Sequence, residues 1–423
     1  MQKNYLWLAL LLLIPLNTIF AQVVKLDDLI AEGIANNPQL KAYRHTITAD
    51  SSRSKTVGSL PDPTVSFNIL NLPVNSFSFD QEAMTGKQVL LRQNFPFFGT
   101  LGLKEEIADK NTTVDTESYR EVKNRLMRDI KTVYYDIYDV DEAITTTGKN
   151  RELLREFVNI AEKKYAVGEG LQQDVLKAQV ELSKMIDRLI TLEQKRSRLI
   201  SKLNALLNRP AGRKFGQTDK PVFSSFTINQ DSLSLEIEKN RPLLKAWRVK
   251  ILQSDDKISL AKKDYWPDMS IFVAYTQRDV LQNGTGGVDF MSGGITLSVP
   301  LYFWRKQDQK ITEEQFVKKQ VQENYYNVRN NVLAELDIVL SDLDKNSQLV
   351  SLYKTAIIPQ ASQALQSAMI GYQTDKVDFL TLINNQMTLF NFELTYAGII
   401  SAYNKNQAQL EYIVGKPLQE IVE

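Results

Sequence analysis

The sequence has 423 residues, with 51 Lys and Arg against 50 Asp and Glu, a formal net charge of +1 and no cysteine. This balance gives no global positive field, so no nucleic-acid partner is expected. The lack of cysteine excludes disulfides, thiolate metal sites and a lipid-modified N-terminal cysteine on this chain. Charged and apolar residues are interspersed without a linker rich in Pro, Gly or Ser. We therefore expect one large architecture rather than a string of domains.

The N-terminal residues predict a cleaved signal peptide, residues 1–21. A lysine and an apolar stretch precede a suitable cleavage site at Ile19-Phe20-Ala21. The apolar run is shorter than the roughly 20 residues of a membrane-spanning helix. Charged residues interrupt every later apolar run, so the mature chain, residues 22–423, is not expected to be a helical inner-membrane protein.

Two copies of one unit follow, and they are offset by 204 residues. The segment Pro38-Gln39-Leu40-Lys41-Ala42-Tyr43-Arg44 closely resembles Pro242-Leu243-Leu244-Lys245-Ala246-Trp247-Arg248. With only 13 prolines in the chain, repeated proline matches on one offset argue against coincidence. We expect two structural repeats, about 22–215 and 226–423. The same offset pairs Pro63 with Pro267, Ser66 with Ser270, Pro96 with Pro300 and Asp174 with Asp378, and it becomes 207 at Pro210 and Pro417.

Each repeat is expected to contain a helix, two strands, a long helix, a turn and a further helix. Apolar residues alternate with small polar residues in two segments of each repeat, a pattern typical of two-faced strands. Polar segments between them, one containing Asn283-Gly284-Thr285-Gly286-Gly287, predict loops within hairpins at 64–95 and 268–301. Phe272 and Gln93 break the alternation. The apolar positions are Val65, Phe67, Ile69, Val89, Leu91, Phe95, Met269, Ile271, Val273, Tyr275, Met291, Gly293, Ile295, Leu297 and Val299.

Long coiled helices are predicted after the strands. A single helix from Leu103 to Val167 would be on the order of 95 Å long, and Gly148, which follows three threonines, is a candidate break in it. A free-standing coiled coil would explain the helices but leaves the four strands without a role. Apolar residues spaced by threes and fours are Val122, Leu126, Ile130, Val133, Ile137, Val140 and Ile144, and then Val175, Ala178, Leu182, Met185, Leu189 and Leu192.

The predicted strands have the length that a membrane requires. Each strand with its flanks approaches the roughly 9 to 11 residues that cross a bilayer. Sheet edges cannot face lipid, and the smallest membrane barrels have eight strands, so four strands predict a ring made of two or three copies of the chain. Aromatic residues beside the strands fit a belt at a membrane interface, with ordinary core packing as the alternative. These aromatic residues are Phe97, Phe98, Trp266, Tyr302 and Trp304.

These features together resemble the outer-membrane efflux protein family, the TolC-like proteins, over essentially the whole mature chain. The resemblance rests on the doubled plan, on Val299-Pro300-Leu301-Tyr302, and on Tyr165-Ala166-Val167-Gly168 followed by Asp174-Val175-Leu176-Lys177-Ala178-Gln179. It implies a mainly α fold with a membrane β-barrel, in which a homotrimer contributes four strands per protomer to a twelve-stranded barrel on an α-helical tunnel. It also implies an outer-membrane location with most of the chain in the periplasm. The implied partners are a periplasmic adaptor (membrane fusion) protein and an inner-membrane pump of the RND or ABC type.

The resemblance further implies two sites at the periplasmic tip of the helices. Adaptor-docking turns would contain Val167, Gly168, Leu171, Asp375 and Val377, although Glu169 and Asp375 depart from the residues typical of the family. A periplasmic gate would consist of Asp174, Tyr372 and Asp378, with Thr381 in place of a further aspartate.

An enzyme is the first alternative to a duct. The chain has one histidine, His45, no cysteine and no Gly-x-Ser-x-Gly, so nucleophilic and zinc chemistry lack their residues, and no cofactor or metal is expected. A carboxylate-pair hydrolase would need a compact cleft, which long helices do not predict. The second alternative is a periplasmic coiled-coil adaptor or scaffold without a pore.

We therefore predict the duct of a tripartite efflux or type I secretion system, which conducts substrate passively. The substrate stays open between drugs, metal cations and polypeptides. The segment from Gln93 to Leu103 loosely resembles the strand-to-helix junction of heavy-metal efflux ducts.

Overall fold

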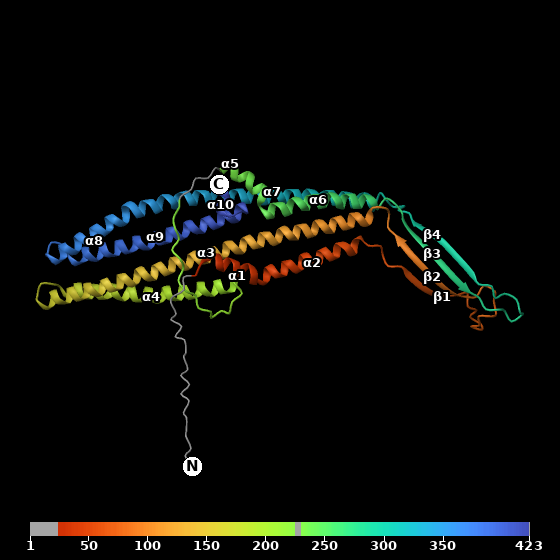
Figure 1. Cartoon of the computed structure of the whole chain (residues 1–423), viewed down its shortest axis with the longest axis horizontal. Helices are drawn as coiled ribbons and strands as arrows, with labels where there is room; N and C mark the ends of the chain where they lie inside the picture. Colours follow the sequence, from red (N-terminus) through yellow and green to blue (C-terminus); the bar gives the residue numbers. More distant parts are fainter. Residues whose placement is uncertain (1–23, 225–229, 423) are drawn as a thin grey trace, which may run out of the picture. The chain divides into compact units, whose positions relative to one another are not determined.

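The computed structural model describes residues 24–224 and 230–422, so the predicted signal peptide, residues 1–21, lies outside the described residues. Its elements confirm the predicted class, a mainly helical fold with four antiparallel strands in two repeats (Figure 1). The first repeat contains α1 (Leu26–Asn36), α2 (Pro38–Gly58), β1 (Thr64–Leu70), β2 (Gly86–Phe95), α3 (Thr100–Ala166) and α4 (Gln172–Leu206). The second contains α5 (Gln230–Asn240), α6 (Pro242–Lys263), β3 (Asp268–Gln277), β4 (Phe290–Ser298), α7 (Gln307–Leu352), a π-helix η1 (Tyr353–Ile357), α8 (Ile358–Gln373), α9 (Phe379–Val414) and α10 (Leu418–Val422).

The described chain divides into two compact units. The helical unit contains α1, α4, η1 and α8, together with α3 from Met127, the end of α7 and α9 up to Ala408. The strand unit contains the four strands, α2, α5, α6 and α10, together with α3 up to Leu126, α7 up to Ser341 and the end of α9.

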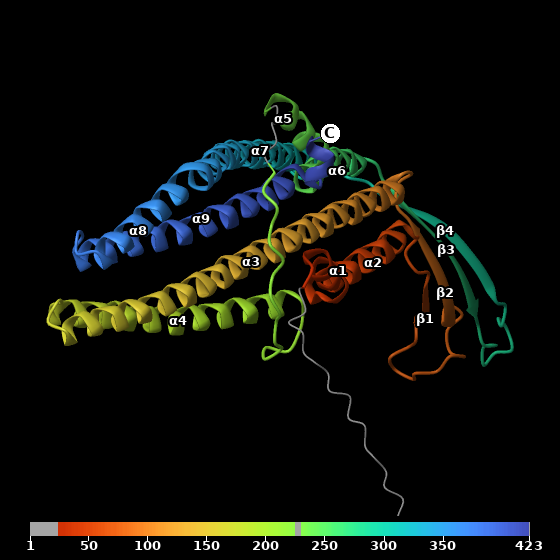
Figure 2. The same ribbon diagram turned by 60° about the vertical axis from the view of Figure 1, so that its left-hand side comes forward.

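One antiparallel sheet joins the two repeats. The strand order is β1-β2-β3-β4, so the central pair, β2 and β3, brings the hairpins of the two repeats together (Figures 1 and 2). β1 begins one residue after Pro63 and β3 one residue after Pro267. Proline lacks an amide hydrogen and therefore suits the position just before a strand.

Within the strand unit, each repeat contains an equivalent side-chain contact between an arginine and a tyrosine. Arg44 of α2 donates to the Tyr119 hydroxyl at 3.0 Å, and Arg248 of α6 donates to the Tyr325 hydroxyl at 3.4 Å. Each guanidinium also lies within 6 Å of the ring it contacts. The short helix of each repeat is therefore tied to its long helix in the same way.

The long helices of the two repeats differ in continuity. α3 runs for 67 residues without a break, so Gly148 does not interrupt it. The second repeat changes to the π-helix η1, which lies immediately before Ile358 and Pro359. A proline inside a helix has no amide hydrogen and collides with the carbonyl four residues earlier, and a wider π turn relieves both problems.

The offset between the repeats changes within the connection from strand to helix. Pro96 and Pro300 are 204 residues apart, whereas α3 and α7 begin at Thr100 and Gln307, which are 207 apart. Three additional residues therefore lie between Pro300 and the start of α7.

This shift corrects one predicted equivalence at the tip. α4 and α9 begin at Gln172 and Phe379, again 207 residues apart. Asp378 is therefore the structural counterpart of Leu171, and the predicted pairing of Asp174 with Asp378 is wrong. The fixed offset of 204 missed the three-residue insertion.

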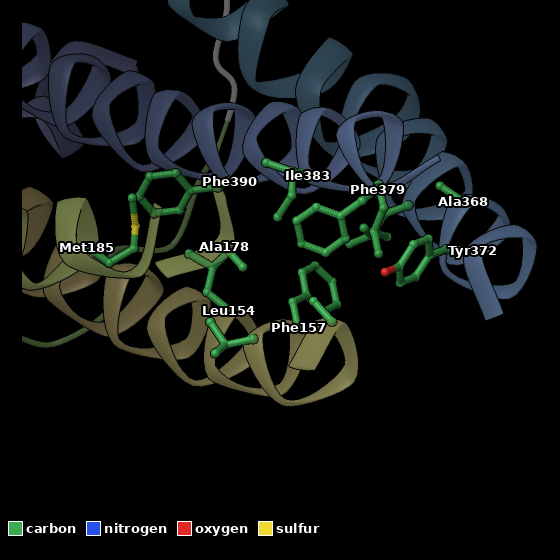
Figure 3. Close-up of a cluster of buried hydrophobic side chains, with 13 residues drawn as sticks. Leu154, Phe157, Ala178, Met185, Ala368, Tyr372, Phe379, Ile383 and Phe390 are labelled. Carbon is green, nitrogen blue, oxygen red and sulfur yellow. The ribbon is translucent and has the colours of Figure 1, made fainter. Parts of the chain in front are cut away.

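An apolar core lies in the helical unit near the tip. It takes side chains from α3, α4, α8 and α9, so the helix pairs of both repeats contribute to it (Figure 3). Burial of these side chains together stabilises the four helices as one packed group. The buried members are Leu154, Phe157, Val158, Ala161, Ala178, Met185, Leu365, Ala368, Tyr372, Phe379, Leu382, Ile383 and Phe390.

Candidate functional site: a two-faced sheet, an aromatic junction and a helical tip

The strand register separates apolar and polar residues onto opposite faces of the sheet. Residues paired across neighbouring strands share a face, and alternate residues along a strand point to opposite faces. One row of the apolar face is Val65, Leu91, Val273 and Gly293, and the next is Phe67, Val89, Tyr275 and Met291. The polar face has Ser66, Leu90, Ala274 and Ser292, and then Asn68, Gln88, Thr276 and Phe290.

On β3, exposure of the two faces is the reverse of that in a water-soluble sheet. On β3, Ile271, Val273 and Tyr275 are 38%, 46% and 48% exposed, whereas Ala274 and Thr276 are 1% and 5% exposed. A soluble two-sided sheet packs its apolar face on a core. An exposed apolar face with small polar residues on the other side is the arrangement of a membrane barrel strand.

Among the residues that break the alternation, Phe272 and Gln93 have local explanations. Phe272 lies on the polar face, where its ring covers Gly294 of β4. Gln93 lies on the apolar face near the end of β2, and its amide donates to the carbonyl oxygens of Pro61 at 2.8 Å and Asn94 at 2.9 Å. The Phe272 ring is thus packed against the strand next to it, and the Gln93 amide has hydrogen-bond partners.

Aromatic side chains gather where the strands join the helices. Phe97 stacks on Trp266 with 5.1 Å between ring centroids and packs edge-on against Phe98 at 6.1 Å. Tyr302 packs edge-on against Trp304 at 6.1 Å. Phe97 is half-buried, which fits core packing, whereas Phe98, Trp266, Tyr302 and Trp304 are exposed, which fits a membrane-interface belt. The belt assignment stays a prediction.

The first tip turn requires glycine for its backbone conformation. Gly168 has φ +81°, and a Cβ added there would meet no atom within 4 Å. The positive φ, rather than crowding, therefore selects glycine. Val167 and Leu171 flank the turn with exposed apolar side chains.

The second tip turn adopts the same conformation without glycine. Asp375, the counterpart of Gly168 at the offset of 207, has φ +57°. Aspartate tolerates this region better than most residues but less well than glycine. The amides of Lys376 and Val377 both donate to the Gly371 carbonyl, at 2.8 Å and 3.3 Å.

A lysine that the sequence did not single out connects the two turns. Lys164 near the end of α3 donates to the Tyr372 carbonyl at 3.0 Å and forms an ion pair with Asp375. The partners are 208 and 211 residues away along the chain, so no local pattern marks the contact.

The predicted gate residues lie close enough to influence one another electrostatically. Within the described protomer, however, the Tyr372 hydroxyl forms no hydrogen bond with either aspartate. Tyr372 is 6% exposed, packs on Phe379 with 5.3 Å between ring centroids, and points into the core (Figure 3). Its hydroxyl is buried without a hydrogen-bond partner among the described residues. Burial, together with the nearby carboxylates of Asp174 and Asp375, raises the pKa of Tyr372.

The two gate aspartates have different environments. Burial raises the pKa of Asp174, and the charge of Asp378 adds to this effect. Asp378 instead accepts the Thr381 amide at 2.6 Å at the start of α9, which lowers its pKa. Asp378 thus has a local helix-capping role in addition to any role in a gate.

Within residues 24–224 and 230–422, no group of three or more His, Cys, Asp or Glu side chains could hold a metal ion. No helix in this described part of the chain is long and apolar enough to cross a membrane.

A sheet with an exposed apolar face, an aromatic junction and paired long helices define the protomer of an outer-membrane channel. The sequence matches the family described as "Outer membrane efflux protein" over residues 29–209 and 233–416. The chain belongs to this family. Membership confirms the predicted class, an outer-membrane efflux channel with a β-barrel and a periplasmic helical tunnel rather than an enzyme, and it implies a trimeric channel that works with an efflux system.

Individual relatives are distant. The chain is 22% identical to the "Toxin and drug export protein A" of Aggregatibacter actinomycetemcomitans over 57% of this chain and 51% of that protein. It is 22% identical to the "Cobalt-zinc-cadmium resistance protein CzcC" of Cupriavidus metallidurans over 44% of this chain and 42% of that protein. The chain thus spans about half the length of each of these two curated relatives. The solved outer-membrane channel OprN is similar in fold, with a TM-score of 0.79, 16% identity, and coverage of 93% of this chain and 90% of that chain.

Proposed function

We propose that three copies of the chain form a passive duct of a tripartite efflux or type I secretion system. Substrate enters at the periplasmic tip and leaves through the barrel. The exposed apolar face of the sheet is the observation on which the proposal rests, since it is stable in lipid but not in water.

The edges of the sheet support assembly into a homotrimer. β1 and β4 are the outer strands of the described sheet, and each has one neighbour. An unpaired backbone group in lipid costs several kcal/mol, so the edges of one protomer must pair with those of the next. Three protomers with four strands each give a closed barrel of twelve strands.

We also propose the domain organisation that the sequence predicts. The signal peptide, residues 1–21, is removed, and the mature duct protomer comprises two repeats at about 22–215 and 226–423. The aromatic residues Phe97, Phe98, Trp266, Tyr302 and Trp304 contact outer-membrane lipid at the level of the head groups.

Adaptor docking is assigned to the tip turns. Val167, Leu171 and Asp375 are exposed on turns of fixed conformation, and Val377 is half-buried beside them. A Gly168→Val variant should strain this turn and weaken cross-linking to the periplasmic adaptor, while the barrel stays in the membrane. Gly148→Ala, a change inside α3 with open space around the added methyl, is the control. Unchanged cross-linking in Gly168→Val would contradict docking at this turn.

The inner-membrane pump, of the RND or ABC type, would supply both energy and substrate selection. The name of one relative concerns toxin and drug export, and that of the other concerns resistance to cobalt, zinc and cadmium. A duct that binds no cargo tightly is compatible with the export of toxins and drugs and with the export of metal cations.

The proposed assembly predicts the mass of the protein in detergent. The mature protein should be a trimer and should conduct ions in planar bilayers. A monomer with intact β-structure would contradict the barrel. A monodisperse protein released by mild osmotic treatment would instead favour a periplasmic scaffold without a pore.

A pair of arginine substitutions tests which face meets lipid. Val273→Arg places a charge on the apolar face and should abolish membrane assembly, since such a charge costs about 2 to 4 kcal/mol at the bilayer midplane. Ser292→Arg changes the polar face at the next level of the sheet and should assemble normally. Equal assembly of both variants would show that the faces are assigned wrongly.

A further inference from the structure

The polar face of the sheet contains almost no charge. Among the residues of the four described strands that point to this face, only Arg92 and Asp268 are charged. Asp268 is the first residue of β3, at the edge of the barrel segment, and its carboxylate accepts the Phe97 amide at 2.8 Å. Among the residues of the described strands, Arg92 is therefore the only charge on this face away from the strand ends.

The neighbours of Arg92 support the guanidinium without neutralising it. Arg92 lies in one row with Phe272 and Gly294, and its guanidinium carbon lies 5.8 Å from the centre of the Phe272 ring. The Phe272 ring fills the space above Gly294, where a Cβ would come within 2.7 Å of it. The ring thus lies against the strand wall and offers its face to the cation. Arg92 is exposed, and no carboxylate in the described part of the chain pairs with it.

A basic cavity lies at the end of the same face. It has a volume of about 980 Å³, and its lining includes Asp268 and Ser298, which both point to the polar face, together with the junction aromatics Trp266 and Tyr302. Six basic and four acidic side chains line it. Two of the acids, Glu313 and Glu314, pair with Lys310 at 3.1 Å and 3.2 Å. The remaining charge of the lining is therefore positive, the same sign as Arg92.

We propose that Arg92 is a selectivity-determining residue, and that one Arg92 from each protomer forms a ring in the barrel lumen that favours the passage of anions over cations. This inference rests on the proposed duct, because a membrane barrel turns its polar face to the lumen. Rings of charged side chains are an established way for a pore to select ions by sign. The cargo that such a lumen favours carries negative charge.

Coulomb's law gives the size of the effect. Three positive charges on the order of 10 Å from the pore axis, in water at about 0.1 M salt, attract an anion and repel a cation enough to change the permeability ratio about fivefold. At about 1 M salt the screening length falls to about 3 Å, and the effect should nearly vanish.

The experiment measures the reversal potential of the purified trimer in planar bilayers under a KCl gradient. Arg92→Gln should lower the ratio of chloride to potassium permeability about fivefold relative to wild type, and Arg92→Glu should lower it further. Arg92→Lys keeps the charge and should keep the ratio. Lys87→Gln removes a positive charge from the same strand but on the apolar face, and it should leave the ratio unchanged. The trimer mass of each variant reports folding.

The outcomes separate the inference from the duct itself. A conducting channel whose reversal potential is the same in wild type, Arg92→Gln and Arg92→Glu would overturn the role of Arg92 and leave the duct intact. An equal shift in Lys87→Gln would overturn it as well, because the effect would then not depend on the face. A wild-type trimer that never conducts would overturn the duct, and the inference with it.

Discussion

Lys164 of α3 donates a hydrogen bond to the carbonyl oxygen of Tyr372 in α8, with 3.0 Å between the two atoms. The same ammonium lies 4.8 Å from the centre of the Tyr372 ring and pairs with Asp375 in the turn beyond it. The lysine side chain is 15% exposed and the aspartate 70%. Because Lys164 belongs to the first repeat and its partners to the second, this contact ties the two tip turns of one protomer together.

Replacement of Lys164 by methionine should loosen the second tip turn. A charged hydrogen bond contributes roughly 1.5 to 3 kcal/mol when buried, but Asp375 is exposed, so we expect a loss of about 1 kcal/mol of local stability. Hydrogen exchange should accelerate at the amides of Lys376 and Val377. Lys163→Met, an exposed neighbour on the same helix, is the matched control. Unchanged protection at both amides in Lys164→Met would show that the contact does not hold the turn.

Two substitutions of Asp375 separate its charge from its backbone conformation. Asp375→Gly and Asp375→Ala both delete the carboxylate that pairs with Lys164. Because φ is +57° at this position, alanine should be less stable than glycine by about 1 kcal/mol. Thermal unfolding of the two variants, followed by circular dichroism, gives the comparison. Equal midpoints would mean that the turn changes conformation when the aspartate is removed.

The Tyr372 hydroxyl should find its partner in the assembled channel. If it donates to Asp174 between neighbouring coils, this charge-assisted bond contributes about 1.5 to 3 kcal/mol to the closed tip. Single-channel recordings of Tyr372→Phe should then show larger or more frequent openings, and the effects of Tyr372→Phe and Asp174→Ala should be less than additive. Wild-type conductance together with raised stability would mean that the hydroxyl is unpartnered in the assembly too, and the gate assignment would be wrong.

A pair of carboxylates in the strand unit predicts a pH dependence. The Asn111 side-chain nitrogen lies 3.3 Å from an Asp50 oxygen and 3.4 Å from an Asp115 oxygen. Burial, followed by the hydrogen bond and charge of Asp50, raises the pKa of Asp115 from its ordinary 3.8 to about 6, and Lys250 opposes this rise. Between these two values the folded chain retains a proton that the unfolded chain has released. Stability should therefore fall as pH rises from about 4 to about 6 and stay level above that range.

Asp50→Asn removes the main electrostatic cause of this shift. The difference in Tm between the variant and wild type should increase as pH rises through the same range, because only the wild type retains two neighbouring carboxylates. Thermal unfolding at a series of pH values checks this. Asp62→Asn, an exposed aspartate, is the control and should show a constant difference. A constant difference for Asp50→Asn as well would contradict the coupling.

The sequence by itself determined the features that depend on local periodicity. Alternation along Met269, Ile271, Val273 and Tyr275 placed a two-faced strand, because successive residues of an extended chain point to opposite sides. Self-similarity revealed the two repeats, and a Gly in the first tip turn matched a positive φ that an L-residue avoids. The aromatic residues beside the strands follow from the sequence itself, whereas the docking and gate residues follow only from the family resemblance, and the roles of all of them stay predictions.

Only the tertiary structure decided which distant residues meet. The register between β2, β3 and β4 placed Arg92, Phe272 and Gly294 in one row, although they come from different repeats and different hairpin arms. Packing of α3 against α8 brought Lys164 to Tyr372 across 208 residues. The three-residue insertion before α7 changed the equivalence of Asp174 and Asp378, and α3 continued through Gly148. Such contacts depend on strand register and helix packing, which are set by the sum of many distant interactions and leave no periodic trace in the chain.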